Sequence, residues 1–127
     1  MSDINRKILV VDDEPDVVRW LTILLENNGY TVVSAVDGSE GFSKAMSDKP
    51  GLIILDISMP KESGVKMYRK LHDFVETSNI PVIMLTGVTS EFEHFISTRK
   101  QVKPPDAYFE KPVDSDILLA KIEELIR

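Results

Sequence analysis

Cysteine is absent from the 127-residue sequence, which excludes a disulfide framework, a thiol nucleophile and any cysteine-ligated zinc or iron–sulfur centre. No apolar run approaches the roughly 18 residues that would span a membrane, and the polar start contains no hydrophobic signal core. Basic residues are fewer than acidic ones, with 15 Lys and Arg against 21 Asp and Glu. The chain therefore lacks the surplus of positive charge that non-specific nucleic-acid binding needs. We therefore expect a cytoplasmic domain that binds neither membranes nor nucleic acid.

The length fits one compact domain, and a hydrophobic content of 43% is enough to build a core. We expect a single domain over residues 1–127, with its core from about residue 7 to residue 126. The least regular stretch, Val102–Asp106, is too short for an interdomain linker and is interpreted as a stiff surface loop.

Short apolar runs alternate along the chain with segments of helical periodicity. Continuous apolar runs are typical of strands covered on both faces, as in a parallel sheet. The expected strands are Lys7–Val11, Thr31–Ala35, Leu52–Leu55, Pro81–Leu85 and Ala107–Glu110. The expected helices are Pro15–Asn28, Ser39–Lys49, Gly64–Phe74, Ser90–Gln101 and a last one that begins at Asp114 or Ser115. This fivefold alternation predicts an α/β fold in which a parallel sheet has helices on both faces.

Polar side chains stand where the expected strands end. Asp12 and Asp13 follow the first strand, Asp56 the third and Thr86 the fourth, and Lys111 follows the fifth. Open α/β sheets bind their ligands outside the carboxyl ends of the strands. We therefore predict that one rim of the sheet collects three carboxylates, one hydroxyl and one ammonium group.

Three carboxylates on one rim need a cation, or they must bind protons. Each pair repels by on the order of 4 kcal/mol at ~4 Å and an effective dielectric near 20. A donor set of oxygens alone favours a hard ion, with Mg²⁺ the first choice. A carboxylate can also act as a nucleophile and form an aspartyl phosphate. Together with the ammonium and the hydroxyl, the rim is suited to phosphoryl transfer.

The chain resembles the CheY-like receiver domain of two-component response regulators over about residues 7–126. The resemblance rests on motifs that appear in order on the expected strands. They are Asp12-Asp13, Asp56-Ile57-Ser58-Met59-Pro60 followed by Gly64, Thr86-Gly87, and Tyr108-Phe109-Glu110-Lys111-Pro112. It implies a flavodoxin-like (βα)5 fold whose doubly wound sheet has the strand order 2-1-3-4-5.

The resemblance also assigns the acceptor and the metal ligands. Asp56 would accept a phosphoryl group from a histidine kinase or a histidine phosphotransfer protein. Asp13 and Asp56 would bind Mg²⁺ directly, Asp12 would bind it partly through water, and Ser58 would contribute its backbone carbonyl. The chain would then be a signalling domain that assists its own phosphorylation and dephosphorylation, without turnover of a separate substrate.

The remaining implied roles concern the response to phosphorylation. Lys111 would pair with the phosphate, Thr86 would turn its hydroxyl onto a phosphate oxygen, and Tyr108 would swing inward as the aromatic half of a switch. The bond between Lys111 and Pro112 is cis in similar domains. The surface of the fourth helix, fifth strand and fifth helix would change for a downstream protein target, for an output domain outside this chain, or for a homodimer formed on activation.

Two features depart from the family pattern, and two other functions compete. Lys103-Pro104-Pro105 stands where the family has a small-residue turn, and the 25 positions from Thr86 to Lys111 exceed the usual interval. One alternative is a Mg²⁺-dependent phosphatase with an aspartate nucleophile, although the acid two residues after the nucleophile is missing. The other is a pseudo-receiver that binds partners without phosphorylation.

Three ring-bearing residues are interpreted structurally. His72 and His94 fall singly on expected helices, so we expect surface residues rather than ligands. Trp20 stands beside the apolar face of the first helix and is expected to be a partly buried packing residue.

Overall fold

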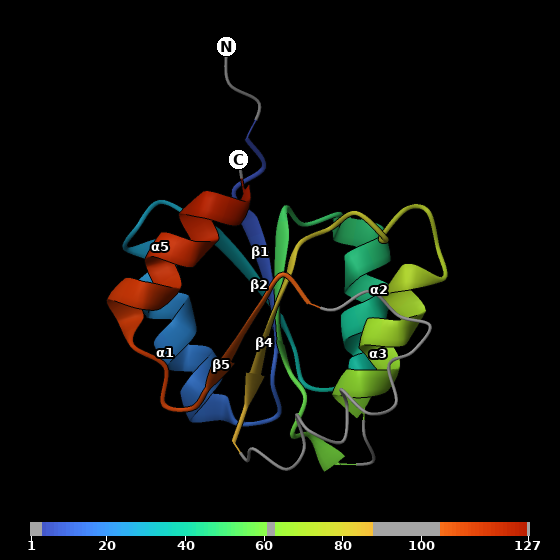
Figure 1. Ribbon diagram of the computed structural model, residues 1–127, viewed down its shortest axis with the longest axis horizontal. Coiled ribbons are helices and arrows are strands. Elements are labelled where there is room, and N and C mark those ends of the chain that lie inside the picture. The colour runs from blue at the N-terminus through green and yellow to red at the C-terminus, as the bar shows by residue number, and fades with distance from the viewer. Residues whose placement is uncertain (1–3, 61–62, 88–104, 127) are drawn as a thin grey trace.

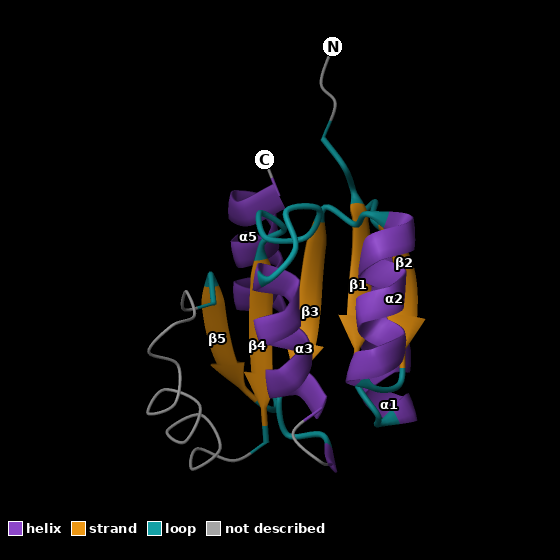
Figure 2. Cartoon of the chain, turned by 90° about the vertical axis from the view of Figure 1, so that its right-hand side faces the viewer, coloured by secondary structure: helices purple, strands orange, loops and turns teal. Residues whose placement is uncertain are grey.

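Five parallel strands form one sheet in the computed structural model, which describes residues 4–60, 63–87 and 105–126. The strand order is β2-β1-β3-β4-β5, and every neighbouring pair is parallel. All strand arrows accordingly point the same way in Figure 2. The strands are β1 Lys7–Val11, β2 Thr31–Ala35, β3 Leu52–Asp56, β4 Val82–Thr86 and β5 Ala107–Glu110. The predicted fold class and strand order are confirmed.

Helices cover both faces of the sheet. In Figure 1, α1 and α5 lie on one side of the strands, and α2 and α3 lie on the other. Their bounds are Pro15–Glu26 for α1, Gly38–Asp48 for α2, Ser63–His72 for α3 and Ser115–Ile126 for α5. The helix predicted over Ser90–Gln101 lies outside the described residues, as does most of the Val102–Asp106 loop.

Local chemistry explains where two of these helices begin. Pro15 occupies the first turn of α1, where its missing N–H removes no helical hydrogen bond. Asp37 precedes α2, and its side chain accepts a hydrogen bond of 2.8 Å from the backbone N–H of Glu40, a typical N-cap. The Asp37 side chain thus gives a partner to one of the N–H groups that a helix start leaves unsatisfied, and Pro15 has no such group to satisfy.

The core is divided by the sheet into two layers. Successive side chains of a strand point to opposite faces, so Leu9 and Val11 pack in one layer, while Ile8 and Val10 pack in the other. The first layer also holds buried residues of α2 and α3, and the second holds those of α1 and α5. Burial on both faces explains why β1, β3 and β4 are continuous apolar runs.

The ring-bearing residues differ in their burial. His72 is half-buried rather than at the surface, because its ring lies 4.6 Å from that of Tyr68 in an edge-on contact. His94 lies outside the described residues. Trp20 is 40% exposed and is not among the side chains packed against either core layer, so it is more exposed than expected. Within residues 4–60, 63–87 and 105–126, no helix combines the length and apolar character that a membrane crossing requires.

Candidate functional site

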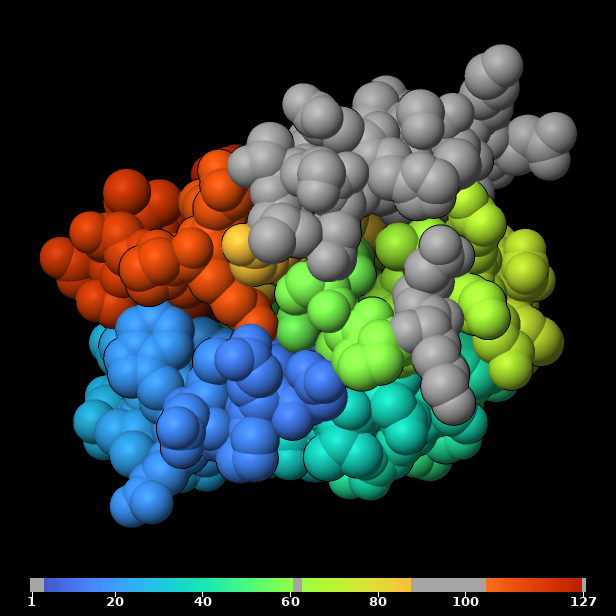
Figure 3. All heavy atoms as spheres, turned by 90° about the horizontal axis from the view of Figure 1, so that it is seen from below, coloured from blue at the N-terminus to red at the C-terminus, as the bar shows by residue number. Residues whose placement is uncertain are grey.

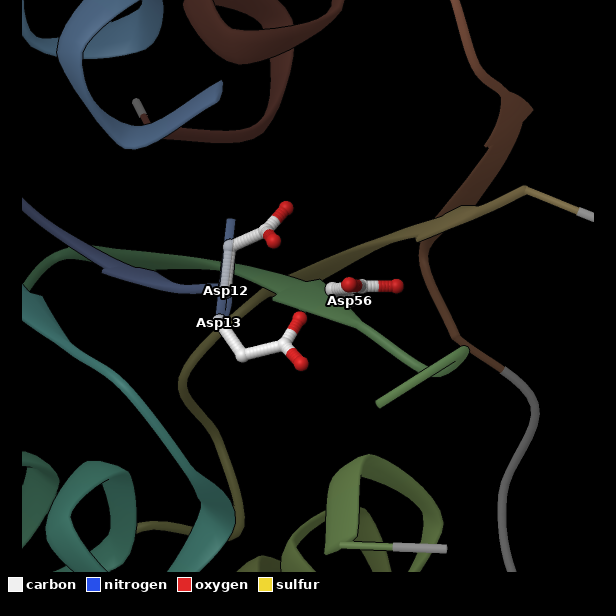
Figure 4. A group of neighbouring side chains, drawn as sticks. All are labelled: Asp12, Asp13 and Asp56. Atoms are coloured by element: carbon white, nitrogen blue, oxygen red, sulfur yellow. The ribbon is translucent and has the colours of Figure 1, made fainter. Parts of the chain in front are cut away.

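Three carboxylates converge at the carboxyl ends of β1 and β3. Asp12 and Asp13 directly follow β1, Asp56 is the last residue of β3, and one oxygen from each lies within 4.8 Å of the others. Figure 4 shows the three side chains directed toward a common space. The predicted acidic cluster is therefore present, although its members are up to 44 positions apart in the sequence.

This end of the molecule is assembled from distant parts of the chain. Figure 3 views it directly, and segments from the blue, green and orange parts of the sequence meet in the middle of the face. Gly64, at the start of α3, lets that helix approach β3 closely, because a β-carbon there would meet the carbonyl group of Asp56. The glycine therefore allows the helix to pack against β3.

Asp56 is held by its own turn. The residue is 1% exposed, and its Oδ1 accepts hydrogen bonds from the backbone N–H of Ser58 at 2.8 Å and from the Ser58 hydroxyl at 2.6 Å. Its other oxygen, Oδ2, faces the Lys111 ammonium at 3.2 Å. One carboxylate oxygen is thus oriented by Ser58, and the other is directed toward a cation.

Lys111 is brought to the cluster by the end of the sheet. Its backbone N–H donates to the carbonyl of Thr86 at 2.8 Å, beyond the last paired residues of β4 and β5. Its Nζ lies 2.6 Å from Glu14 Oε1, 3.0 Å from Asp12 Oδ2 and 3.2 Å from Asp56 Oδ2. Burial by itself lowers the pKa of Lys111, but the three carboxylates outweigh burial and raise that pKa. The ammonium is therefore charged at neutral pH.

Asp12 is the carboxylate most affected by its surroundings. Its side chain is buried, and Oδ1 accepts a hydrogen bond of 2.9 Å from the backbone N–H of Glu14. Burial raises the pKa of Asp12 from 3.8 to about 6, and the charge of Asp56 adds to this rise. The Glu14 N–H and the Lys111 ammonium oppose the change without cancelling it. Burial, together with the Asp56 charge, therefore disfavours the ionised form of Asp12.

The donor set suits a hard divalent ion. Every side-chain donor of the cluster is a carboxylate oxygen, which is the ligand type that Mg²⁺ prefers. Asp13 is exposed, whereas Asp12 and Asp56 are buried, so the cluster is open on the Asp13 side. The raised pKa of Asp12 independently indicates that the site gains from added positive charge. The residues present therefore fit Mg²⁺.

The two predicted switch residues lie on neighbouring strands. Thr86 ends β4 and is fully buried. Tyr108 is the second residue of β5, is half-buried and packs against the core layer beneath α2 and α3. Lys111 and Pro112 are joined by a cis peptide bond, as the resemblance implied.

Sequence reasoning did not assign Glu14 to this site. Its side chain makes the shortest of the three carboxylate contacts with Lys111. It also lines a hollow of about 540 Å³ between α1 and the loop after β5, together with Trp20, Lys111 and Val113. The only signal in the sequence was its place directly after the acidic pair.

Comparison with known proteins gives one family. The chain matches the model of the response regulator receiver domain over residues 8–123. It is 36% identical over 123 residues to the alkaline phosphatase synthesis transcriptional regulatory protein PhoP of Bacillus subtilis, a match that covers 97% of this chain and 49% of PhoP. It is also 36% identical over 120 residues to protein PilH of Pseudomonas aeruginosa, covering 94% of this chain and 97% of PilH.

Solved structures agree with these relatives. A response regulator receiver domain protein (CheY-like) from Methanospirillum hungatei superimposes with a TM-score of 0.79 at 30% identity, covering 94% of this chain and 92% of that one. The chain thus spans about half the length of PhoP and nearly all of PilH.

Proposed function

The chain belongs to the response regulator receiver domain family, and we propose on this basis that Asp56 accepts a phosphoryl group in a Mg²⁺-dependent reaction. The observation that carries the proposal is the buried Asp56 carboxylate, which faces the Lys111 ammonium at 3.2 Å beside two further aspartates. We further propose that residues 1–127 act as one receiver domain. In this family the domain is a signalling element, and we propose that it turns over no separate substrate.

The transfer begins with the Asp56 carboxylate as nucleophile. The donor is a phosphohistidine of a sensor histidine kinase or of a phosphotransfer protein. A carboxylate oxygen of Asp56 forms the new bond to phosphorus while the donor's nitrogen–phosphorus bond breaks, and the bonding electrons remain on the imidazole. The Ser58 hydrogen bonds orient the Asp56 carboxylate during the attack, and Lys111 offsets charge on the transferred group.

Four groups would hold the ion. These are the side chains of Asp12, Asp13 and Asp56 and the backbone carbonyl of Ser58. When bound there, Mg²⁺ would neutralise phosphate charge and would reduce the repulsion between the incoming anion and the aspartates. The chain's own contribution is to present ionised carboxylates. The cluster is open to solvent beside the exposed Asp13, so an ion can reach them from that side.

Phosphorylation then has a route to the protein surface. A phosphoryl group adds roughly two negative charges and three strong acceptors near Thr86, at the end of β4. We propose that the Thr86 hydroxyl turns toward a phosphate oxygen and that Tyr108 on the neighbouring strand moves inward. The face that includes β5 and α5 would change for a downstream protein, an output domain or a second copy of the chain.

The test is a mass measurement. The protein is incubated with Mg²⁺ and a small acyl phosphate, and we expect the mass of one added phosphate. Asp56→Asn should abolish the gain, whereas Asp73→Asn, which changes an exposed aspartate after α3, should keep it. Steady phosphate release from many phosphate esters would instead support a phosphatase. If the protein neither gains the phosphate nor releases phosphate from esters, the result would support a phosphorylation-independent interaction module.

A further inference from the structure

The Lys111 ammonium makes its shortest contact with Glu14 rather than with the phosphoacceptor. Its Nζ lies 2.6 Å from Glu14, against 3.0 Å from Asp12 and 3.2 Å from Asp56. An ammonium group has three N–H donors, and two of those of Lys111 donate hydrogen bonds, to Glu14 and to Asp56, while Asp12 adds an ion pair. A phosphoryl group that arrives at the site therefore meets a lysine that three carboxylates already hold.

The three carboxylates differ sharply in their exposure. The Glu14 side chain is 59% exposed, whereas those of Asp12 and Asp56 are 1% exposed. Releasing Lys111 from the buried Asp12 would leave a charge away from water, which is costly, whereas Asp56 would lose its own carboxylate charge on phosphorylation. Releasing it from Glu14 costs much less, because water can solvate the freed carboxylate. Glu14 is therefore the partner that Lys111 can exchange most easily.

The backbone of Glu14 is anchored although its side chain is exposed. Its N–H donates to Asp12 Oδ1 at 2.9 Å, and its carbonyl accepts from the N–H groups of Val17 and Val18 at the start of α1, each at 3.1 Å. The Cα of Glu14 is therefore held beside the acidic cluster, within reach of Lys111. Its side chain can leave and return without disturbing the strand or the helix.

We propose that Glu14 is a positioning residue that holds the Lys111 ammonium in the unphosphorylated protein and competes with the phosphoryl group for it. The inference rests on the proposed phosphorylation of Asp56. Glu14 stabilises the unphosphorylated form selectively, since its contact with Lys111 is lost when the lysine turns to the phosphoryl oxygens. Glu14 thus limits the affinity of the site for a phosphoryl group.

Three variants separate this contact from a general effect of charge. Glu14→Gln removes the charge and the ion pair. Glu14→Asp keeps the charge but shortens the side chain by one methylene, so that it no longer reaches Lys111. Asp16→Asn removes a neighbouring acid that lines the same hollow and has no ion pair with Lys111 in the described part of the chain.

The measurement is the concentration of beryllofluoride, a phosphoryl mimic, that half-saturates the protein at constant Mg²⁺. Trp20 is the only tryptophan and lines the hollow beside Lys111, so its fluorescence follows binding. Both Glu14 variants should lower the half-saturating concentration by about 2- to 5-fold, the range for a partly exposed ion pair. Asp16→Asn should leave it within error of wild type.

A spectroscopic signature tests the contact itself. In protein labelled with ¹⁵N-lysine, the Nζ signal of Lys111 in the free protein should shift in Glu14→Gln and Glu14→Asp but not in Asp16→Asn. The inference is wrong if Glu14→Asp binds the mimic like wild type, if Asp16→Asn matches Glu14→Gln, or if the Nζ signal does not move. Wild-type protein that binds no beryllofluoride would instead reject the proposed function.

Discussion

Replacing Asp13 by asparagine should have opposite effects on the ion-free and the magnesium-bound protein. The substitution keeps the size of the side chain and removes one charge from a cluster whose carboxylate oxygens lie within 4.8 Å of one another. Without a cation, that charge repels Asp12 and Asp56. With Mg²⁺ bound, the same negative charge attracts the ion. Asp13→Asn should therefore stabilise the ion-free protein and weaken its response to Mg²⁺.

The magnitude follows from the separation of the charges. Two unit charges 4.8 Å apart repel by about 1 kcal/mol in water and by about 3 to 4 kcal/mol at an effective dielectric near 20. Asp13 is exposed and Lys111 cancels part of the field, so we expect a gain of about 1 to 2 kcal/mol in the free energy of unfolding. For a domain of this size that corresponds to a Tm increase of about 3–8 °C.

The magnesium response supplies a second quantity. Above half-saturation, each tenfold increase in Mg²⁺ should add about 1.4 kcal/mol to the stability of the wild type. In Asp13→Asn the same rise should begin at a Mg²⁺ concentration at least about tenfold higher, because loss of a full charge beside a divalent ion exceeds the energy of a tenfold change in affinity.

Thermal unfolding in a chelator and across a magnesium series measures both effects. Glu26→Gln is the control, since it removes an exposed charge at the far end of α1 and should change neither quantity by more than about 0.5 kcal/mol. A variant Asp13→Asn that is less stable than wild type in chelator, yet equally responsive to Mg²⁺, would refute the electrostatic reasoning.

Two further predictions concern packing and protonation. Gly64→Ala should cost about 1–3 kcal/mol of stability in urea unfolding, because the added methyl group would meet the Asp56 carbonyl. Gly87→Ala is the control and should lose no packing energy, since the nearest atom to its methyl group would be Ser58 Oγ at 3.7 Å. Equal losses in the two variants would contradict the close approach of Gly64 to β3. In magnesium-free buffer the folded chain binds a proton at Asp12 more readily than the unfolded chain, because burial raises the pKa from 3.8 to about 6. This group should therefore lower stability by up to about 3 kcal/mol as the pH rises from about 4 to about 7. Asp12→Asn should flatten that slope, and identical slopes in the two proteins would contradict the prediction.

The sheet was predictable because burial on both faces requires a continuous run of apolar residues, which is easy to recognise in the sequence. The predicted bounds of β1, β2 and β5 are those of the structure, and β3 runs one residue further, to Asp56. β4 begins at Val82 instead of Pro81, since proline has no N–H to give to the ladder. The carbonyl of Pro81 nevertheless accepts a hydrogen bond from Ile53, so the proline adjoins the sheet without being a paired residue.

Side-chain partnerships were harder to predict than strand ends. The converging aspartates follow from topology alone, because parallel strands place their carboxyl ends at one edge. The contact between Glu14 and Lys111 spans 97 positions and depends on the rotamers of two long side chains, which no periodicity encodes. The half-burial of His72 likewise involves a side-chain contact, between its ring and that of Tyr68, that no periodicity encodes. Helix ends were also overestimated, with α1 ending at Glu26 instead of Asn28.

The charges at the site explain why the proposed function needs both a divalent ion and a lysine that can exchange one partner for another. The four carboxylates of Asp12, Asp13, Glu14 and Asp56 and the one ammonium of Lys111 leave a net charge of −3, which one Mg²⁺ would reduce to −1. The proposed phosphorylation would replace the single charge of Asp56 by roughly two on the phosphoryl group, and the site would need still more positive charge. The ammonium held by the exposed Glu14 is the nearest cation available to meet that need. A lysine whose other partner was the buried Asp12 alone could be drawn away only at the cost of leaving that carboxylate without its cation.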